Sequence, residues 1–123
     1  MTNYIFGDRW SLLIIRDLLF MEKQYYGDFL NSTEKISTNI LANRLEKLEV
    51  DGLITKKVDA KNRSKKIYRL TEKGLDLLPM LLEMIVWSAK YDKQTLAPKK
   101  FIEQIQTDRD DFMQEIRRKL NVL

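Results

Sequence analysis

The chain contains no cysteine and no histidine among its 123 residues. The missing cysteine excludes thiol catalysis, disulfides and cysteine-based zinc sites, and the missing histidine excludes acid–base catalysis by imidazole. There is also no glycine-rich phosphate loop and no convincing pair of carboxylates. The sequence therefore gives little support to an enzyme, and we expect no cofactor.

Long apolar segments are also missing. No run approaches the roughly 18 apolar residues that a membrane-spanning helix needs. The first residues, Met1–Asp8, have neither the basic end nor the apolar core of a signal peptide. We therefore expect a cytoplasmic protein with no membrane partner.

What the chain does contain is enough for one globular domain over residues 1–123, with 44% hydrophobic and 33% charged residues. The net charge of +4 is unevenly placed. Between Lys56 and Lys66 there are six basic residues and only one acid, Asp59, an excess larger than the net charge of the whole chain. Such a concentrated basic site suggests a polyanionic partner, and the alternative is a solvated hairpin tip.

The most informative stretch is Ile36–Ile54, which predicts a helix over residues 37–51 followed by a stop at Gly52 and the start of a strand. The helix has one apolar stripe, formed by Leu41, Leu45 and Leu48. Short polar side chains occupy its other face, and they suit the reading of base edges in a major groove. These residues are Thr38, Asn39 and Asn43.

The elements around this helix complete a recognisable layout. A largely apolar helix is predicted over residues 8–21 with Asp8 as its N-cap, and a short one over residues 25–30 with Phe29 and Leu30 turned inward. Two strands are predicted at residues 53–58 and 66–70, joined by a polar loop that forms a wing over residues 58–66.

Two further helices follow the second strand. Thr71 caps a long helix that runs from Leu75 to about Tyr91, in which Pro79 should produce a kink or a local break. After a connector at residues 95–98, a last helix is predicted from Lys99 to Leu120, with an apolar stripe and a polar gap near Asp108. The first of these helices carries more apolar surface than one small domain can cover. Together with the final amphipathic helix, this suggests a second subunit.

The fold class expected from this pattern is mainly α with a small two-stranded β-wing (α+β). It is a winged helix-turn-helix with extra terminal helices for dimerisation. We assign residues 8–71 to the winged core. Residues 72–123, together with 1–7, are assigned to the dimerisation helices.

Several motifs in this order resemble one family, the HxlR-type winged helix-turn-helix transcriptional regulators. The first-helix signature is similar to Gly7–Leu18, the second-helix motif to Tyr26–Phe29 and the recognition helix to Ile36–Leu45. The entrance and exit of the wing resemble Leu48–Ile54 and Tyr68–Gly74. The resemblance covers residues 7–91 and leaves the tail from Lys93 without a matching motif.

The resemblance implies a bacterial or archaeal regulator, a repressor or an activator. It would bind a palindromic site on double-stranded DNA as a homodimer whose terminal helices pair across the two-fold axis. Two features depart from the family pattern. Many members sense oxidants through a cysteine near the N-terminus, which this chain lacks. Members also have a longer segment before the first signature, whereas six residues precede Gly7 here, so part of the dimer surface would be missing or supplied by the tail.

Candidate DNA contacts lie on the recognition helix and on the wing. Thr38, Asn39 and Asn43 are the candidates for base contacts, with ordinary solvent exposure as the alternative. Ser37 either caps the helix or donates to a phosphate. Further along, Arg44 and Lys47 would contact phosphate or pair with Glu46 or Glu49. The wing residues expected to contact DNA are Lys61, Asn62, Arg63, Ser64 and Lys65.

Among the wing residues, Arg63 is the candidate for insertion into a narrow minor groove, where the negative potential attracts a guanidinium group. The wing lysines would bind phosphate, which positions the protein without specifying sequence.

Two other clusters have weaker functional interpretations. Trp10, Trp87 and Tyr91 could line a pocket for an unknown small-molecule effector between subunits, although aromatics on apolar helices are more often core. Three acids near residue 110 do not match a calcium loop, and they are more typical of a solvated helix face. These acids are Asp108, Asp110 and Asp111.

One alternative function is a winged-helix module for protein–protein contacts without sequence-specific DNA binding, because a fold does not fix a function. The basic wing and the amide-rich helix argue against this alternative. RNA binding is a weaker variant, since the major groove of A-form RNA does not admit a helix.

Overall fold

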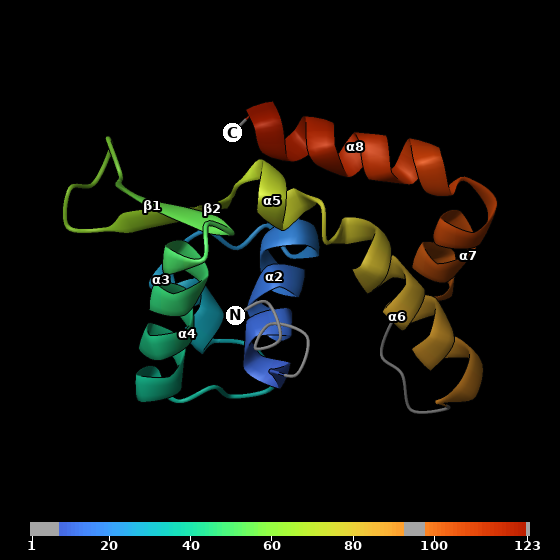
Figure 1. Ribbon diagram of the computed structural model, residues 1–123, viewed down its shortest axis with the longest axis horizontal. Coiled ribbons are helices and arrows are strands. Elements are labelled where there is room, and N and C mark those ends of the chain that lie inside the picture. Colours follow the sequence, from blue (N-terminus) through green and yellow to red (C-terminus); the bar gives the residue numbers. More distant parts are fainter. Residues whose placement is uncertain (1–7, 93–97, 123) are drawn as a thin grey trace. The chain divides into compact units, whose positions relative to one another are not determined.

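A computed structural model describes residues 8–92 and 98–122 (Figure 1). The predictions that concern Gly7, the dimerisation segment 1–7 and the connector at 95–97 lie outside these residues. The described residues fall into two compact units, one ending at Leu75 and one beginning at Asp76. Each unit is described by itself.

The first unit begins with helix α2, Arg9–Phe20, and its N-cap is Asp8 as the sequence predicts. The Asp8 carboxylate accepts a hydrogen bond from the backbone N–H of Trp10 at 3.3 Å. One face of α2 is buried, but Leu12, Leu13 and Phe20 are half-buried and Met21 is exposed. Within a single chain, the predicted burial on nearly all sides is therefore only partly achieved.

Helices α3, Tyr26–Leu30, and α4, Thr38–Val50, form the helix-turn-helix. Phe29 of α3 is buried as predicted, whereas Leu30 is only half-buried. The α4 stripe predicted to face inward is buried, with Leu41, Leu45 and Leu48 at most 3% exposed. The backbone reverses after α4 at Gly52, whose φ of 79° lies in the left-handed region that glycine adopts without steric cost.

Strands β1, Ile54–Val58, and β2, Lys66–Leu70, pair antiparallel with Ile54 opposite Leu70. A single antiparallel bridge between Tyr25 and Ile67 adds the segment before α3 to the edge of β2. The loop between the strands projects beyond α3 and α4, as Figure 1 shows. This hairpin is the wing, and with α3 and α4 it gives the predicted winged helix-turn-helix.

The long helix predicted after Thr71 is interrupted. Helix α5 covers only Glu72–Leu75, and after two intervening residues a separate helix α6 spans Leu78–Tyr91. Pro79 lies in the first turn of α6, where its missing N–H costs no hydrogen bond, rather than inside a continuous helix. Of the two outcomes expected for Pro79, the structure shows the break.

The last predicted helix is also two helices in the second unit, α7 at Lys99–Thr107 and α8 at Arg109–Val122. Asp108 separates them, because its φ of −131° and ψ of 49° are not helical. Asp often caps a new helix, and the Asp108 carbonyl accepts the Phe112 N–H at 2.9 Å. Phe101 and Phe112 pack edge to face across this turn, with ring centroids 5.4 Å apart. None of the described helices is long and apolar enough to cross a bilayer.

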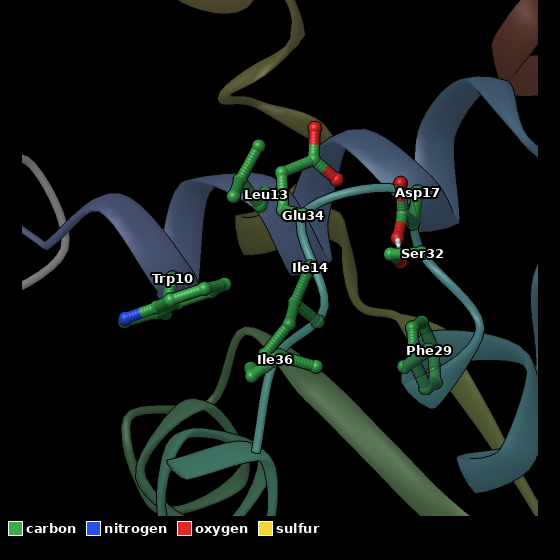
Figure 2. A pocket seen from close by; sticks show the side chains of 8 residues that line it. All are labelled: Trp10, Leu13, Ile14, Asp17, Phe29, Ser32, Glu34 and Ile36. Carbon is green, nitrogen blue, oxygen red and sulfur yellow. Dashed lines mark hydrogen bonds between the residues drawn. The ribbon is translucent and has the colours of Figure 1, made fainter.

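A polar cluster joins α2 to the turn between α3 and α4. Asp17, which is 2% exposed, accepts hydrogen bonds from Ser32 at 2.7 Å, from Lys23 at 3.2 Å and from Arg16 at 2.7 Å. Figure 2 shows Asp17 and Ser32 facing each other from the two segments. Arg16 also holds the Glu34 carboxylate through two hydrogen bonds of 2.8 and 3.1 Å. These bonds satisfy the buried acid and fix the turn between α3 and α4 on α2.

The first prediction concerns Gly74, where α5 closely approaches Leu53, which precedes β1, and Leu70 of β2. A Cβ atom at this position would lie 2.3 Å from the Leu53 carbonyl oxygen and 2.8 Å from Leu70 Cδ2. Gly74→Ala should therefore lower the free energy of unfolding in urea by about 1–3 kcal/mol, although alanine favours helices.

Gly27→Ala is the matched control, because a Cβ on this helical glycine meets nothing within 4 Å. It should stabilise the protein by about 0.4–1 kcal/mol. Equal effects of the two substitutions would contradict the close approach.

The second prediction concerns pH. The hydrogen bonds from Arg16 lower the pKa of Glu34 from 4.5 to about 2. The folded state therefore binds fewer protons than the unfolded state between these values, and the stabilisation is complete only above a pH of 4.5.

Unfolding in urea over a pH series should show wild type more stable than Glu34→Gln at neutral pH. The difference should shrink as the pH falls through 4.5 toward 2. A difference that does not change with pH would refute this ion pair.

Candidate nucleic-acid interface

The exposed face of α4 follows directly from the burial of its leucines. Because a helix repeats every 3.6 residues, Asn39, Asn43 and Glu46 share the side opposite the buried stripe. All three side chains are exposed, as are Ser37, Thr38 and Lys47. The structure thus leaves most of the predicted helix residues exposed, and it brings Asn39 and Asn43 together on one face.

The N-terminus of α4 is fixed by two hydrogen bonds. The Ser37 hydroxyl accepts from the Ile40 N–H at 3.2 Å, which is the predicted capping role. The Tyr26 hydroxyl on α3 donates to the Thr38 carbonyl at 3.1 Å. The start of α4, where the residues expected to reach bases lie, is therefore fixed both by its own cap and by a hydrogen bond from α3.

Arg44 is paired differently from the sequence expectation. Its Nε donates to the Asp8 carboxylate at 2.5 Å, and its Nη1 donates to Asn43 Oδ1 at 2.7 Å. Arg44 does not pair with its predicted partners Glu46 and Glu49. The packing of α2 against α4 instead brings Asp8, at the start of α2, beside Arg44. Glu49 instead lies 3.9 Å from Lys56 of β1.

This pairing orients the recognition face. Burial disfavours the charged form of Asp8, but the hydrogen bonds from Ser11 and Arg44 outweigh it and lower the pKa of Asp8. The ionised carboxylate holds the guanidinium, and the guanidinium holds the oxygen of the Asn43 amide. An amide whose oxygen is held in this way presents its N–H groups as donors.

The wing separates its charges by exposure. All six basic side chains between Lys56 and Lys66 are exposed, whereas the single acid, Asp59, is 7% exposed. At the tip, Ser64 donates its hydroxyl to Asn62 Oδ1 at 2.6 Å, and the Lys65 N–H donates to the Asn62 carbonyl at 2.9 Å. Asn62 and Ser64 thus build the turn that presents Lys61 and Arg63 to solvent.

Sequence reasoning missed four residues that position this surface. Asp8 was assigned only as a cap, and the hydroxyls of Tyr25 and Tyr26 were given no role. The sequence does mark Asp59, because it is the only acid in the strongly basic run between Lys56 and Lys66. The other partners lie 12 to 36 residues apart along the chain, so no local pattern shows them.

The aromatic residues proposed for an effector pocket fall into two groups. Trp10 lines a small cavity in the first unit, together with Leu13 and Ile36 (Figure 2). The volume of this cavity is about 10 Å³, room for about one water molecule. Trp87 and Tyr91 of α6 stack at a tilt, with ring centroids 5.3 Å apart, and they are 64% and 62% exposed.

The acids near the start of α8 give no cation site. Asp108, Asp110 and Asp111 are all exposed. Across residues 8–92 and 98–122, no three acids lie close enough together to hold a metal ion.

Comparison with known proteins places the chain among helix-turn-helix transcriptional regulators. A family model described as HxlR-like helix-turn-helix matches residues 5–96. The HTH-type transcriptional regulator YodB of Bacillus subtilis is 33% identical over 87 residues, covering 71% of this chain and 77% of that protein. An uncharacterized HTH-type transcriptional regulator of the same species, YdeP, is 33% identical over 90 residues, covering 73% and 70%. Both relatives are named as transcriptional regulators and not as enzymes.

Solved structures agree with the sequence comparison. The reduced form of YodB from B. subtilis matches with a TM-score of 0.61 and 30% identity, covering 76% of this chain and 91% of that one. The crystal structure of PA1607 matches with a TM-score of 0.64 and 38% identity, covering 77% of this chain. The match spans 63% of PA1607, less than two thirds of its length.

Proposed function

The chain belongs to the family of HxlR-like helix-turn-helix proteins, and on this premise we propose that it regulates transcription by binding a palindromic operator as a homodimer. Helix α4 enters the major groove, and the wing lies on the minor groove and the backbone. The observation that carries the proposal is the exposed face of α4 beside a wing whose basic side chains are all exposed.

The two surfaces have different tasks. Asn43, oriented by Arg44, can donate to acceptor atoms on base edges, and Thr38 and Asn39 lie near it on the same helix. Lys61 and Arg63 at the wing tip neutralise phosphates, and Arg63 can reach a narrow minor groove. Because Arg44 is paired with Asp8, its first role is to orient Asn43 rather than to bind phosphate.

The homodimer is supported by an apolar stripe on α6. Met84, Trp87 and Tyr91 are spaced three and four residues apart on one side of the helix, and they are 43%, 64% and 62% exposed. Large exposed aromatic patches are typical of protein interfaces. A second copy of the chain would cover this stripe. A dimeric helix-turn-helix protein binds half-sites that lie one helical turn of DNA apart.

The third prediction separates base contacts from phosphate contacts. Binding is measured by fluorescence anisotropy, at two salt concentrations, to a duplex selected from a random library and to its scrambled version. Asn43→Ala should cost about 1–3 kcal/mol, mainly on the selected duplex. Lys61→Ala combined with Arg63→Ala should weaken binding to both duplexes and reduce the salt slope by about two.

A charge-matched control is Lys99→Ala combined with Lys100→Ala, which removes two exposed basic residues from α7. This variant should keep both the preference for the selected duplex and the salt slope. If the α4 and wing variants bind like wild type, the assigned surface is wrong, and the protein–protein module becomes the better interpretation.

The fourth prediction concerns assembly. Wild type should sediment as a dimer at micromolar concentration, and Trp87→Lys should shift it toward monomer because a charge then replaces the centre of the apolar stripe. Glu103→Gln on α7 changes the net charge by the same amount and should remain dimeric. A monomeric wild type would overturn the proposed homodimer.

A further inference from the structure

Asp59 is an unexpected residue on a surface that binds phosphate. It is the only acid between Lys56 and Lys66, and it would repel the DNA backbone if it were exposed. Its side chain is instead buried at the base of the wing, where β1 ends. A buried carboxylate needs partners, and these partners show what Asp59 does.

Both oxygens of the Asp59 carboxylate are engaged. The Tyr25 hydroxyl donates to Oδ2 at 2.8 Å, and the Lys61 N–H donates to Oδ1 at 2.9 Å. The Asp59 N–H donates to the Lys65 carbonyl at 2.9 Å, which closes the wing loop. The Lys61 N–H, followed by the Tyr25 hydroxyl, lowers the pKa of Asp59, so the carboxylate is ionised at neutral pH.

Tyr25 reaches the wing from outside it. Its backbone N–H donates to Asp28 Oδ2 at 3.1 Å, and its backbone bridges to Ile67 of β2. The Lys65 ammonium lies 5.2 Å from the centre of the Tyr25 ring, within the range of a cation–π interaction. One fixed aromatic side chain therefore contacts both the first and the last part of the wing loop.

We propose that Tyr25 and Asp59 form a latch that holds the wing in its DNA-binding conformation before DNA is bound. This inference rests on the proposed function, and it makes both side chains positioning residues rather than DNA contacts. If the latch is absent, only a fraction of the molecules carries an ordered wing, and the apparent affinity falls by that fraction.

The latch and simple electrostatics predict opposite signs for one substitution. Asp59→Ala removes a negative charge from a basic surface, so charge alone would tighten binding to DNA. The latch predicts weaker binding instead, because the wing loses its anchor. Tyr25→Phe removes only the hydroxyl and changes no charge, and it should weaken binding by about threefold to tenfold, as expected for one hydrogen bond.

Glu46→Gln is the matched control for charge. Glu46 is exposed on the α4 face that carries Asn39 and Asn43, and it lies outside the wing. Removing its charge should tighten binding to any duplex, which gives the size of the electrostatic effect against which Asp59→Ala is compared.

The fifth prediction is tested with these three variants and wild type, by DNA anisotropy and by hydrogen exchange of the Asp59, Lys61 and Lys65 amides without DNA. Both latch variants should exchange these amides faster and bind the selected duplex more weakly. In the background of Lys61→Ala with Arg63→Ala, Tyr25→Phe should have a smaller further effect on affinity than in wild type, because two of the contacts that it positions are already gone. A general loss of folding would instead weaken binding by the same factor in both backgrounds.

Two results would overturn the latch. One is unchanged amide exchange in Tyr25→Phe, and the other is binding by Asp59→Ala as tight as that of Glu46→Gln. Failure of the proposed function has a different signature, since wild type would then bind neither duplex. In that case the amide exchange alone would decide whether Tyr25 orders the wing.

Discussion

The burial of three leucines on α4 is the constraint on which the rest of the structure depends. Leu41, Leu45 and Leu48 are each at most 3% exposed. Because of the helical repeat, Asn39 and Asn43 must then face outward. Burying three such side chains contributes several kcal/mol, roughly 1.5–3 for each, so the helix cannot rotate to hide its amides without a large loss of stability. The orientation of the candidate recognition surface is thus a consequence of core packing.

Acidic side chains then organise the basic ones around this core. Asp17 holds Arg16 and Lys23 beneath the helix-turn-helix, Asp8 holds Arg44, and Asp59 is anchored to Tyr25 under the wing. Each of these acids is buried or half-buried, whereas all six basic side chains between Lys56 and Lys66 are exposed. The exposed surface of the wing is consequently more positive than its composition suggests, and the buried Asp59 helps to set the geometry in which that charge is presented.

Much of this arrangement could be predicted from the sequence, because it depends on local patterns. The α4 stripe, the Ser37 and Asp8 caps and the reversal at Gly52 each need only a few neighbouring residues, and each is confirmed. The helix breaks near Pro79 and at Asp108 were harder to predict. A proline can kink a helix or begin one, and a polar gap can lie within a continuous helix. The outward faces of Asn39 and Asn43 followed from the helical periodicity of α4.

The pairings across the fold did not follow from any pattern. Asp8 and Arg44 are 36 residues apart, and Tyr25 and Asp59 are 34 residues apart. Packing alone brings them together, and no periodic signal in the sequence records it. The assigned DNA contacts stay predictions, although their exposure and their partners are now defined.

The central claim is that α4 enters the major groove of DNA as one of a symmetric pair. Dimethyl sulfate footprinting on a selected duplex tests it most directly, because the reagent methylates guanine N7 in the major groove. A symmetric pair of α4 helices in the major groove should protect two clusters of guanines with centres about 10 base pairs, or one helical turn, apart. Tight binding without protection of guanine N7, or with a single protected cluster, would contradict it.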